Sequence, residues 1–520
     1  MSTPPDSYDA AIVGGGLAGL TLALQLLRRR PRTRVAVVER ASFPVPEAAH
    51  KVGEATVENG AHYFREVLGL EDHLEREQIR KLGLRFFMTH GDNRAIAPRL
   101  EVGSRFFLPS RTYQLDRGRF ENELARRVAA AGGEIHDGTR VRAVELDPGG
   151  RHALVCEGEG GERTLRARWA LDASGRRAVL KNKLGLRRPV DHDVNAVWFR
   201  LGEAIAVDDL IDADEPPADP ATAAAWRERV PSGERWRSTN HLMGPGYWAW
   251  LIPLASGSVS VGIVADERLV PFETINRFEK ALAWLRANEP QLAAAVERRA
   301  GGLQDFRKLR RYAHGCARVY SPERWCISGE AGAFLDPLYS PGSDFIGLSN
   351  TYVTDLVCRD LDGEDVGERA ERCNDAYLAA FESALETWRG QYPLMGHPRI
   401  WAAKAAWDTL AYFAGPNLLF VNGALADLEF MDSVAETWDR HRELGSAMQR
   451  FFGEWAARDD GAVPPGGFTD LSEELYRRLN GELLDRLDHG QLRRRLARNL
   501  GLLETVAGEI RSLAVADAAA

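Results

Sequence analysis

The sequence has few cysteines for its 520 residues, and the five that it has are scattered. They form no C-x-x-C pair, and no histidine lies at the spacing of a zinc site. We therefore expect no metal centre, and an odd, scattered set is typical of reduced thiols in a cytoplasmic protein. The cysteines are Cys156, Cys316, Cys326, Cys358 and Cys373.

The chain also lacks an excess of positive charge and has only one long apolar run. The net charge is −8, which argues against a nucleic-acid partner. Residues 10–27 are about long enough to span a membrane. They contain three adjacent glycines, Thr21 and Gln25, and are preceded by Asp6 and Asp9 rather than by basic residues. We expect no signal peptide, no membrane span and a cytoplasmic location.

Repeats and low-complexity segments are missing as well, and the length allows two or three domains. The pattern predicts an α/β core over residues 1–350, with inserted β-rich segments at about 80–115 and 194–310. From residue 351 to 520 the pattern is helical, because glycines and prolines fall between the helical segments rather than within them.

A glycine-rich turn between an apolar strand and a helix opens the chain. Residues 10–13 carry no charge, as in a buried parallel strand. Glycines follow at G-x-G-x-x-G spacing, and residues 20–27 then have the apolar period of a helix. A second apolar run, 35–38, ends in the acid Glu39. This order of strand, turn, helix, strand and acid is the pattern of a dinucleotide site.

Each glycine of the motif has its own role. Gly14 permits the tight turn, Gly16 lets backbone N–H groups approach the pyrophosphate, and Gly19 lets the helix pack on the strand. The helix N-terminus then faces the phosphates, and Glu39 accepts hydrogen bonds from ribose hydroxyls. We expect the same site to include Leu17, Ala18 and Arg40.

Other elements are predicted from local patterns. Residues 79–87 alternate and predict one strand. Asp116 precedes a helical pattern at 118–131, so its carboxylate is expected to cap that helix. Residues 134–144 and 153–168 predict a hairpin-rich sheet, and 319–328 predict one further strand of the core.

Four further stretches carry motifs. Residues 329–337 read Gly-Glu-Ala-Gly-Ala-Phe-Leu-Asp-Pro, and 53–56 read Gly-Glu-Ala-Thr. Residues 248–253 fit W-x-W-x-I-P, which alone also suits a strand with two indoles on one face. Lys81 lies in Lys-Leu-Gly-Leu-Arg-Phe, although a lysine at a strand end is usually solvated. Together with the dinucleotide turn, these stretches resemble the flavin-dependent halogenases, a branch of the FAD monooxygenase fold.

The resemblance implies an FAD-binding, Rossmann-like α/β core of the aromatic-hydroxylase type, with a β-rich substrate region and a helical C-terminal region. Residues 329–337 are similar to the second FAD motif of the family, with Glu330 in place of its usual aspartate. The implied further cofactor contacts are Gly53, Glu54, Ala55, Thr56, Arg117, Asp172, Glu330, Asp336, Pro337, Gly342 and Ser343.

The resemblance also implies a two-site mechanism. In this family, reduced FAD from a separate flavin reductase reacts with oxygen and a halide ion, and hypohalous acid crosses a tunnel to an active-site lysine. Lys81 matches that lysine, whose amine can accept the halogen and position it against an electron-rich carbon. The implied tunnel residues are Trp248, Trp250, Ile252 and Pro253, and Tyr339 and Ser340 are implied near the chemistry.

Two departures from the family concern the turn after Asp336. Tyr339 stands where tryptophan halogenases have a glutamate that assists loss of the ring proton. This favours a substrate that activates itself, such as a phenol or a pyrrole, free or tethered to a carrier protein. The implied halide site is Pro341 with Gly342, but a proline has no N–H to donate.

The missing donor keeps open the alternative of a flavin-dependent monooxygenase, a hydroxylase of the same fold. A separate alternative is a flavoprotein that serves as a maturation factor without halogenating anything. Residues 398–420 are rich in aromatics, which suits a packed helix pair or a lid over an aromatic substrate.

Overall fold

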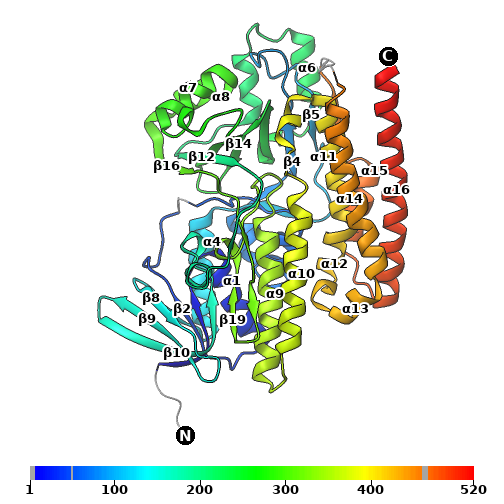
Figure 1. Cartoon of the computed structure of the whole chain (residues 1–520). Coiled ribbons are helices and arrows are strands. Elements are labelled where there is room, and N and C mark those ends of the chain that lie inside the picture. The colour runs from blue at the N-terminus through cyan, green and yellow to red at the C-terminus, as the bar shows by residue number, and fades with distance from the viewer. Residues whose placement is uncertain (1–5, 48–50, 460–465, 520) are drawn as a thin grey trace.

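Two eight-stranded sheets and a long set of C-terminal helices are the largest parts of the described chain, which also has two two-stranded sheets (Figure 1). The computed structural model describes residues 6–47, 51–459 and 466–519, without the side chains of 516–519. The α/β class predicted from the sequence is confirmed. In Figure 1 the first sheet lies near the N-terminus, the second lies above it, and the C-terminal helices stand along one side of both.

The first sheet is built around the βαβ unit that the glycine motif predicts. Strand β1 (Ser7–Val13) pairs in parallel with β2 (Val35–Val38) and with β10 (Gly161–Asp172). Helix α1 (Leu17–Arg29) connects β1 to β2 and packs on α9 (Gly342–Leu361). The other strands of the first sheet are β7 (Glu134–His136), β8 (Arg140–Glu145), β9 (His152–Gly158), β18 (Tyr320–Ser321) and β19 (Trp325–Ile327).

The second sheet forms the β-rich region. Its strands, in spatial order, are β16 (Leu303–Leu309), β12 (Val194–Leu201), β15 (Val259–Asp266), β14 (Tyr247–Pro253), β13 (Thr239–Gly244), β4 (Leu84–Phe87), β5 (Glu101–Gly103) and β20 (Phe468–Asp470). Because side chains alternate along a strand, Ala249 and Leu251 of β14 pack in one core cluster, and Trp248 and Trp250 pack in another. The sheet therefore turns both indoles to the side that holds the C-terminal helices.

Shorter helices cover the sheets, and the longest follow residue 341. The helices before that point are α2 (Glu58–His62), α3 (Glu71–Glu77), α4 (Arg117–Ala130), α5 (Val179–Lys183), α6 (Pro220–Glu228), α7 (Phe278–Asn288) and α8 (Pro290–Glu297). Those after it are α9, α10 (Gly367–Leu385), α11 (Pro398–Tyr412), α12 (Leu418–Val421), α13 (Leu428–Ser433), α14 (Ala435–Ala456), α15 (Glu474–Glu482) and α16 (His489–Ala519). A π-helical turn, Phe413–Asn417, joins α11 to α12. Helix α16 packs on α14 and α11.

Two predicted strands are each divided in the structure. Residues 79–87 form β3 (Ile79–Lys81), which pairs with β6 (Thr112–Gln114), and β4, which belongs to the second sheet. Gly83 lies between them with a φ of +84°, a left-handed conformation that ends a strand. Residues 319–328 are also wrong as one strand, since β18 and β19 pair as a short antiparallel hairpin. The break at Gly83 leaves Lys81 at the end of its own small sheet.

The expected cap at Asp116 is wrong in its chemistry. The residue does stand at the N-terminus of α4, but its side chain makes no capping bond. Instead its Oδ2 accepts a hydrogen bond from the backbone N–H of Ser256 at 3.2 Å. A buried carboxylate in a tertiary contact has thus replaced the local cap.

Candidate active site

The glycine turn opens into a cavity of about 860 Å³ at the carboxyl end of β1. A cavity of this size suits a large organic ligand. It brings together residues from both sheets and from the start of α9. The expected cofactor residues that line it are Gly14, Gly16, Leu17, Ala18, Glu39, Arg40, Gly53, Glu54, Ala55, Arg117, Glu330, Asp336, Pro337, Gly342 and Ser343. We call it the flavin cavity.

The three motif glycines differ in what surrounds them. A Cβ on Gly19 would lie 1.9 Å from the carbonyl oxygen of Gly14, so Gly19 is required for the close contact of helix and strand. Gly14 has a φ of +108°. At Gly16 a Cβ would meet no protein atom nearer than the Lys51 Nζ, at 4.0 Å. The space beside Gly16 is therefore open to a ligand, and these residues fit the pyrophosphate of FAD.

Glu39 is fixed at the end of β2 by two backbone donors. Its Oε2 accepts from the N–H of Gly15 at 2.7 Å, and its Oε1 accepts from the N–H of Ala41 at 2.9 Å. The carboxylate lines the flavin cavity and can still accept from ribose hydroxyls.

Glu54 lines the same cavity but is held by the second sheet. Its Oε1 accepts from the Nε of Arg200 at 2.7 Å, and Arg200 also donates to Asp305 at 3.0 Å. Burial raises the pKa of Glu54, while the charge of Arg200 opposes that rise. Glu54 thus ties the 53–56 segment to β12.

Four expected residues lie outside the lining of the flavin cavity. Gly19 is packed beneath it, Thr56 is fully buried beside Tyr113, and Pro253 pairs with Val259 at the end of β14. The Asp172 carboxylate accepts the backbone N–H groups of Ser174 and Leu180 and shapes a turn. The implied cofactor contacts of Thr56 and Asp172, and the tunnel role of Pro253, therefore stay predictions.

Lys81 lines a second cavity, of about 520 Å³, among β3, α2, α9 and the C-terminal helices. The lysine is 3% exposed, so it is not an ordinary solvated lysine. Its Nζ donates to the carbonyl oxygen of Thr56 at 2.7 Å. Burial lowers the pKa of Lys81 to about 7, although the nearby carboxyl groups of Glu58 and Asp344 raise it in part. We call this space the lysine cavity.

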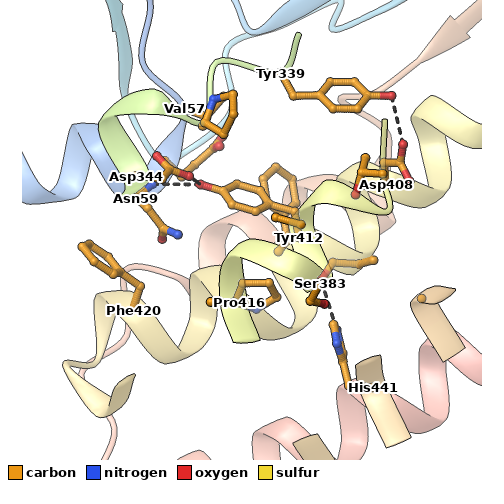
Figure 2. Close-up of a pocket in the computed structure, with 18 of the residues that line it drawn as sticks. Val57, Asn59, Tyr339, Asp344, Ser383, Asp408, Tyr412, Pro416, Phe420 and His441 are labelled. Carbon is orange, nitrogen blue, oxygen red and sulfur yellow. Dashed lines mark hydrogen bonds between the residues drawn. The ribbon is translucent and has the colours of Figure 1, made fainter. Parts of the chain in front are cut away.

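Glu58 and Asp344 are functional candidates that the sequence reasoning missed. Both line the lysine cavity, and burial raises the pKa of each to about 7. Asp344 accepts from the N–H of Gly60 at 2.8 Å and from the hydroxyl of Tyr412 at 2.7 Å (Figure 2). Glu58 accepts from the amide of Asn480 at 3.2 Å. One signal was available in the sequence. Glu58 stands two residues after Thr56, which ends the Gly-Glu-Ala-Thr motif, and Asp344 stands two residues after Gly342 of the expected halide site.

The turn before α9 separates the two cavities. Tyr339 lines the lysine cavity, Ser340 lines the flavin cavity, and Pro341 and Phe345 line both. Tyr339 and Ser340 have φ values of +69° and +57°, which is rare for non-glycine residues and typical of functional turns. The Tyr339 hydroxyl donates to Asp408 at 3.0 Å (Figure 2). We call this turn, Tyr339 to Pro341, the partition, since it is the segment that separates the two cavities.

Asp336 holds the start of this turn. It lies in the wall of the flavin cavity, and its Oδ2 accepts from Tyr392 at 2.6 Å, from the Nε2 of His192 at 2.7 Å and from Tyr312 at 3.0 Å. Its Oδ1 accepts the N–H of Leu338 at 2.9 Å. Four donors on one carboxylate fix the backbone that leads to the partition.

A row of rings connects the two cavities. Ring centroids are 5.6 Å apart between Trp250 and Trp248, 5.4 Å between Trp248 and His241, 4.7 Å between His241 and Phe86, and 5.9 Å between Phe86 and Tyr339. Burial lowers the pKa of His241 to about 3, so its ring is neutral. Trp248, Trp250 and Ile252 line the flavin cavity. Nothing in the sequence indicated a partner for His241.

The described residues contain no group of three histidine, cysteine or acidic side chains that could bind a metal. Within the same ranges, no helix is both long and apolar enough to cross a bilayer.

Comparison with known proteins links the chain to flavin enzymes. The family model described as "FAD binding domain" matches residues 7–215. The chain is 28% identical over 378 residues to the flavin-dependent halogenase chlA of Dictyostelium discoideum, a match that covers 67% of this chain and 60% of that protein. It is 26% identical over 441 residues to the tetracycline 7-halogenase of Kitasatospora aureofaciens, covering 76% and 73%.

Solved structures agree at the level of the fold. The crystal structure of the halogenase PltM in complex with phloroglucinol and FAD superposes with a TM-score of 0.65 and 16% identity, and the match covers 96% of each chain. The flavin-dependent brominase Bmp2 superposes with a TM-score of 0.57 and 19% identity, over 74% of this chain and 87% of that one. Together these matches agree with the resemblance seen in the sequence: the chain is similar to flavin-dependent halogenases, and it has an FAD-binding, Rossmann-type α/β fold.

Proposed function

We propose that the chain is an FAD-dependent halogenase that installs chlorine or bromine on an electron-rich aromatic ring through hypohalous acid and Lys81. One observation carries the proposal. A buried lysine with a lowered pKa lines a cavity that shares only the turn at Pro341 and Phe345 with the flavin cavity. A simple hydroxylase has no need of a separate chamber with a reactive amine.

Bound reduced FAD, delivered by a flavin reductase, supplies the electrons that activate oxygen for oxidation of the halide. The chain contributes the halide's surroundings. The first N–H groups of a helix have no partner within it, and those of Gly342 and Ser343 begin α9 at the wall of the flavin cavity. Helix N-termini attract anions, so these two groups replace part of what Pro341 cannot donate.

Lys81 receives the halogen and presents it to the ring. Only a neutral amine has a lone pair for an electrophile, and a pKa of about 7 leaves a large fraction of Lys81 neutral at physiological pH. The bond to the Thr56 carbonyl fixes the nitrogen at one side of the cavity. The aromatic row through Trp248, His241 and Phe86 keeps the route from the flavin dry.

Glu58 is the base that we assign to the ring proton. When the halogen is transferred from nitrogen, the ring supplies the electron pair of the new bond, the amine is restored, and the ring carbon loses a proton. Tyr339 is no carboxylate, as the sequence shows, but two acids of the lysine cavity, Glu58 and Asp344, lie close enough to Lys81 to shift its pKa. Both oxygens of Asp344 are already engaged, by Gly60 and Tyr412, which leaves Glu58 as the better base. If Glu58 serves as this base, then the lack of a glutamate at position 339 is a weaker argument against substrates such as tryptophan.

The test supplies the FAD-loaded protein with NADH, a flavin reductase, bromide or chloride, and phenols or pyrroles, free and tethered to a carrier protein. Halogenated products detected by mass spectrometry support the proposal, and Lys81→Met must abolish them while oxygen consumption continues. A hydroxylated ring without halogen would support the monooxygenase alternative. The maturation-factor alternative would be supported if reduced flavin gave neither product.

A further inference from the structure

The lysine cavity continues between α10 and α14 toward the surface. Ala379 and Ser383 of α10 line it, one helical turn apart, and face Trp438, Arg442 and Gly445 of α14. Neither Ala379 nor Ser383 belongs to a core cluster, and both are half-buried. Helix α14 packs mainly on α11 and α16. We call this space the α10–α14 window.

Side-chain bridges close the window at both of its ends. At one end Arg372 of α10 pairs with Asp432 of α13 at 2.7 Å. At the other end Ser446 of α14 donates to Glu386, just beyond α10. From Ala376 to Ser383, α10 presents small side chains over about 10 Å of its length, at 1.5 Å per residue. The window is therefore a framed opening and not a general separation of the two helices.

The space behind the window is lined mainly by apolar and aromatic side chains, and the carboxylate of Asp408 in this lining is paired with Lys404. Figure 2 shows Ser383, His441, Pro416, Phe420 and Tyr412 among the residues that line this cavity, together with Asp344, Asn59 and Asp408. Burial lowers the pKa of His441 to about 4, so its ring is neutral.

A further charged pair lies at the mouth, where Asp439 and Arg442 are 3.4 Å apart. A mainly apolar passage with a few paired polar groups is typical of a site that buries the apolar part of a small molecule.

We infer that the substrate is an elongated molecule, in which an electron-rich ring reaches Lys81 and an extended apolar chain of the same molecule occupies the α10–α14 window. This inference rests on the proposed function. The volume of about 520 Å³ falls in the range of about 300–1,000 Å³ for small-molecule sites. It exceeds what a single ring fills, and it is a passage between helices rather than a face large enough for a second protein.

The experiment measures the binding of 4-methylphenol and 4-heptylphenol to the oxidised, FAD-loaded protein by calorimetry, with no halide present. Each methylene that enters an apolar site tightens binding by about fourfold. We therefore expect 4-heptylphenol to bind at least 100-fold more tightly than 4-methylphenol. Equal affinities for the two phenols would overturn the inference.

Ser383→Trp tests the location, because it fills the window with an indole. This variant should lose most of the extra affinity for 4-heptylphenol, while its affinity for 4-methylphenol should stay within about twofold of the wild-type value. Ala379→Phe is the second variant, in case the first does not fold. Glu382→Trp is the matched control, since Glu382 lies on the same helix and is exposed outside the cavity lining. If Ser383→Trp and Glu382→Trp retain the same gain, the chain binds elsewhere and the inference fails.

These outcomes are separable from failure of the proposed function. One outcome is that 4-heptylphenol binds more tightly than 4-methylphenol, that Ser383→Trp removes this difference, and that no phenol is halogenated. This outcome would support the substrate chain in the α10–α14 window and reject the proposed halogenase activity. Halogenation of both phenols with equal kcat/KM in the wild type upholds the halogenase and rejects the window.

Discussion

Tyr339 and Ser340 are neighbours in the chain, yet Tyr339 lines the lysine cavity and Ser340 lines the flavin cavity. Both adopt left-handed backbone conformations, and the surrounding structure must hold them there. Asp336 does so from the start of the turn, through its bond from the N–H of Leu338, and Asp408 does so through the Tyr339 hydroxyl. The C-terminal helices therefore control the shape of the partition.

Tyr339→Phe should reveal how strongly the helices hold this turn. It removes one hydrogen bond to a charged group, so the free energy of unfolding should fall by about 1.5–3 kcal/mol. Asp408→Ala should cost more, about 3–5 kcal/mol, because it leaves the buried Lys404, 2.6 Å from Asp408, without its ion pair. Urea denaturation measures both. Equal losses in the two variants would contradict this order.

The glycine turn allows a sharper test of the flavin cavity. Gly16→Val should fold, because the space beside Gly16 is open, but should weaken FAD binding by at least about 100-fold by occupying the pyrophosphate position. Gly19→Val should not fold, because its Cβ would overlap the Gly14 carbonyl. Circular dichroism and FAD fluorescence titration separate the two effects. Full FAD occupancy in a folded Gly16→Val protein would show that the pyrophosphate lies elsewhere.

The parts of the fold that follow from local sequence were predictable, and those that depend on distant contacts were not. The βαβ unit around Gly14 was predictable because strand, turn and helix are consecutive. The division of residues 79–87 was missed because alternation continues across Gly83, and only its φ ends the strand. Asp116 was misassigned because a tertiary donor, Ser256, competes for its carboxylate.

The candidate site was found in part for the same reason. Lys81 and the turn at Pro341 stand in recognisable segments, whereas the pairing of Glu58 with Asn480 joins residues more than 400 positions apart. Burial, which sets the pKa of these groups, is a property of the assembled cavity. The α10–α14 window is invisible in the sequence, because it depends on where the small side chains of α10 lie relative to α14 in the folded chain.

The lowered pKa of Lys81 predicts a pH dependence for halogenation. The amine accepts the halogen only when neutral, so product formed per oxygen consumed should rise from pH 6 to pH 8 around a midpoint near 7. Glu58→Gln removes a negative charge that raises the Lys81 pKa, so the midpoint should move to lower pH in that variant. Single-turnover yields at fixed halide measure both midpoints. A midpoint that moves to higher pH in the variant would show that the charge of Glu58 does not raise the pKa of Lys81.

Glu58 should also make stability depend on pH. Its folded-state pKa, about 7, lies above the value of about 4.3 expected in the unfolded chain. The folded state therefore binds more protons between these values, and this contribution to stability is lost as pH rises through 7. The free energy of unfolding of Glu58→Gln, relative to that of the wild type, should therefore rise by on the order of 2–3 kcal/mol between pH 4.5 and pH 8. Denaturation at several pH values measures it, and a constant difference would show that Glu58 stays charged.

Pro341 provides the decisive test of the halide site. It lines both cavities and precedes Gly342 at the N-terminus of α9, and it has no N–H to donate. Pro341→Thr restores a backbone donor and places a hydroxyl at a capping position, which α9 lacks. A hydrogen bond to a charged group contributes about 1.5–3 kcal/mol. The concentration of chloride needed for half-maximal product should therefore fall by roughly tenfold or more. Bromide, which sheds its hydration more easily, should gain less, and the ratio of the two half-maximal concentrations isolates the added donor from any general change in activity. If the variant folds and binds FAD while both halides behave as in wild type, then the halide is bound away from this turn and the donors of α9 do not hold it.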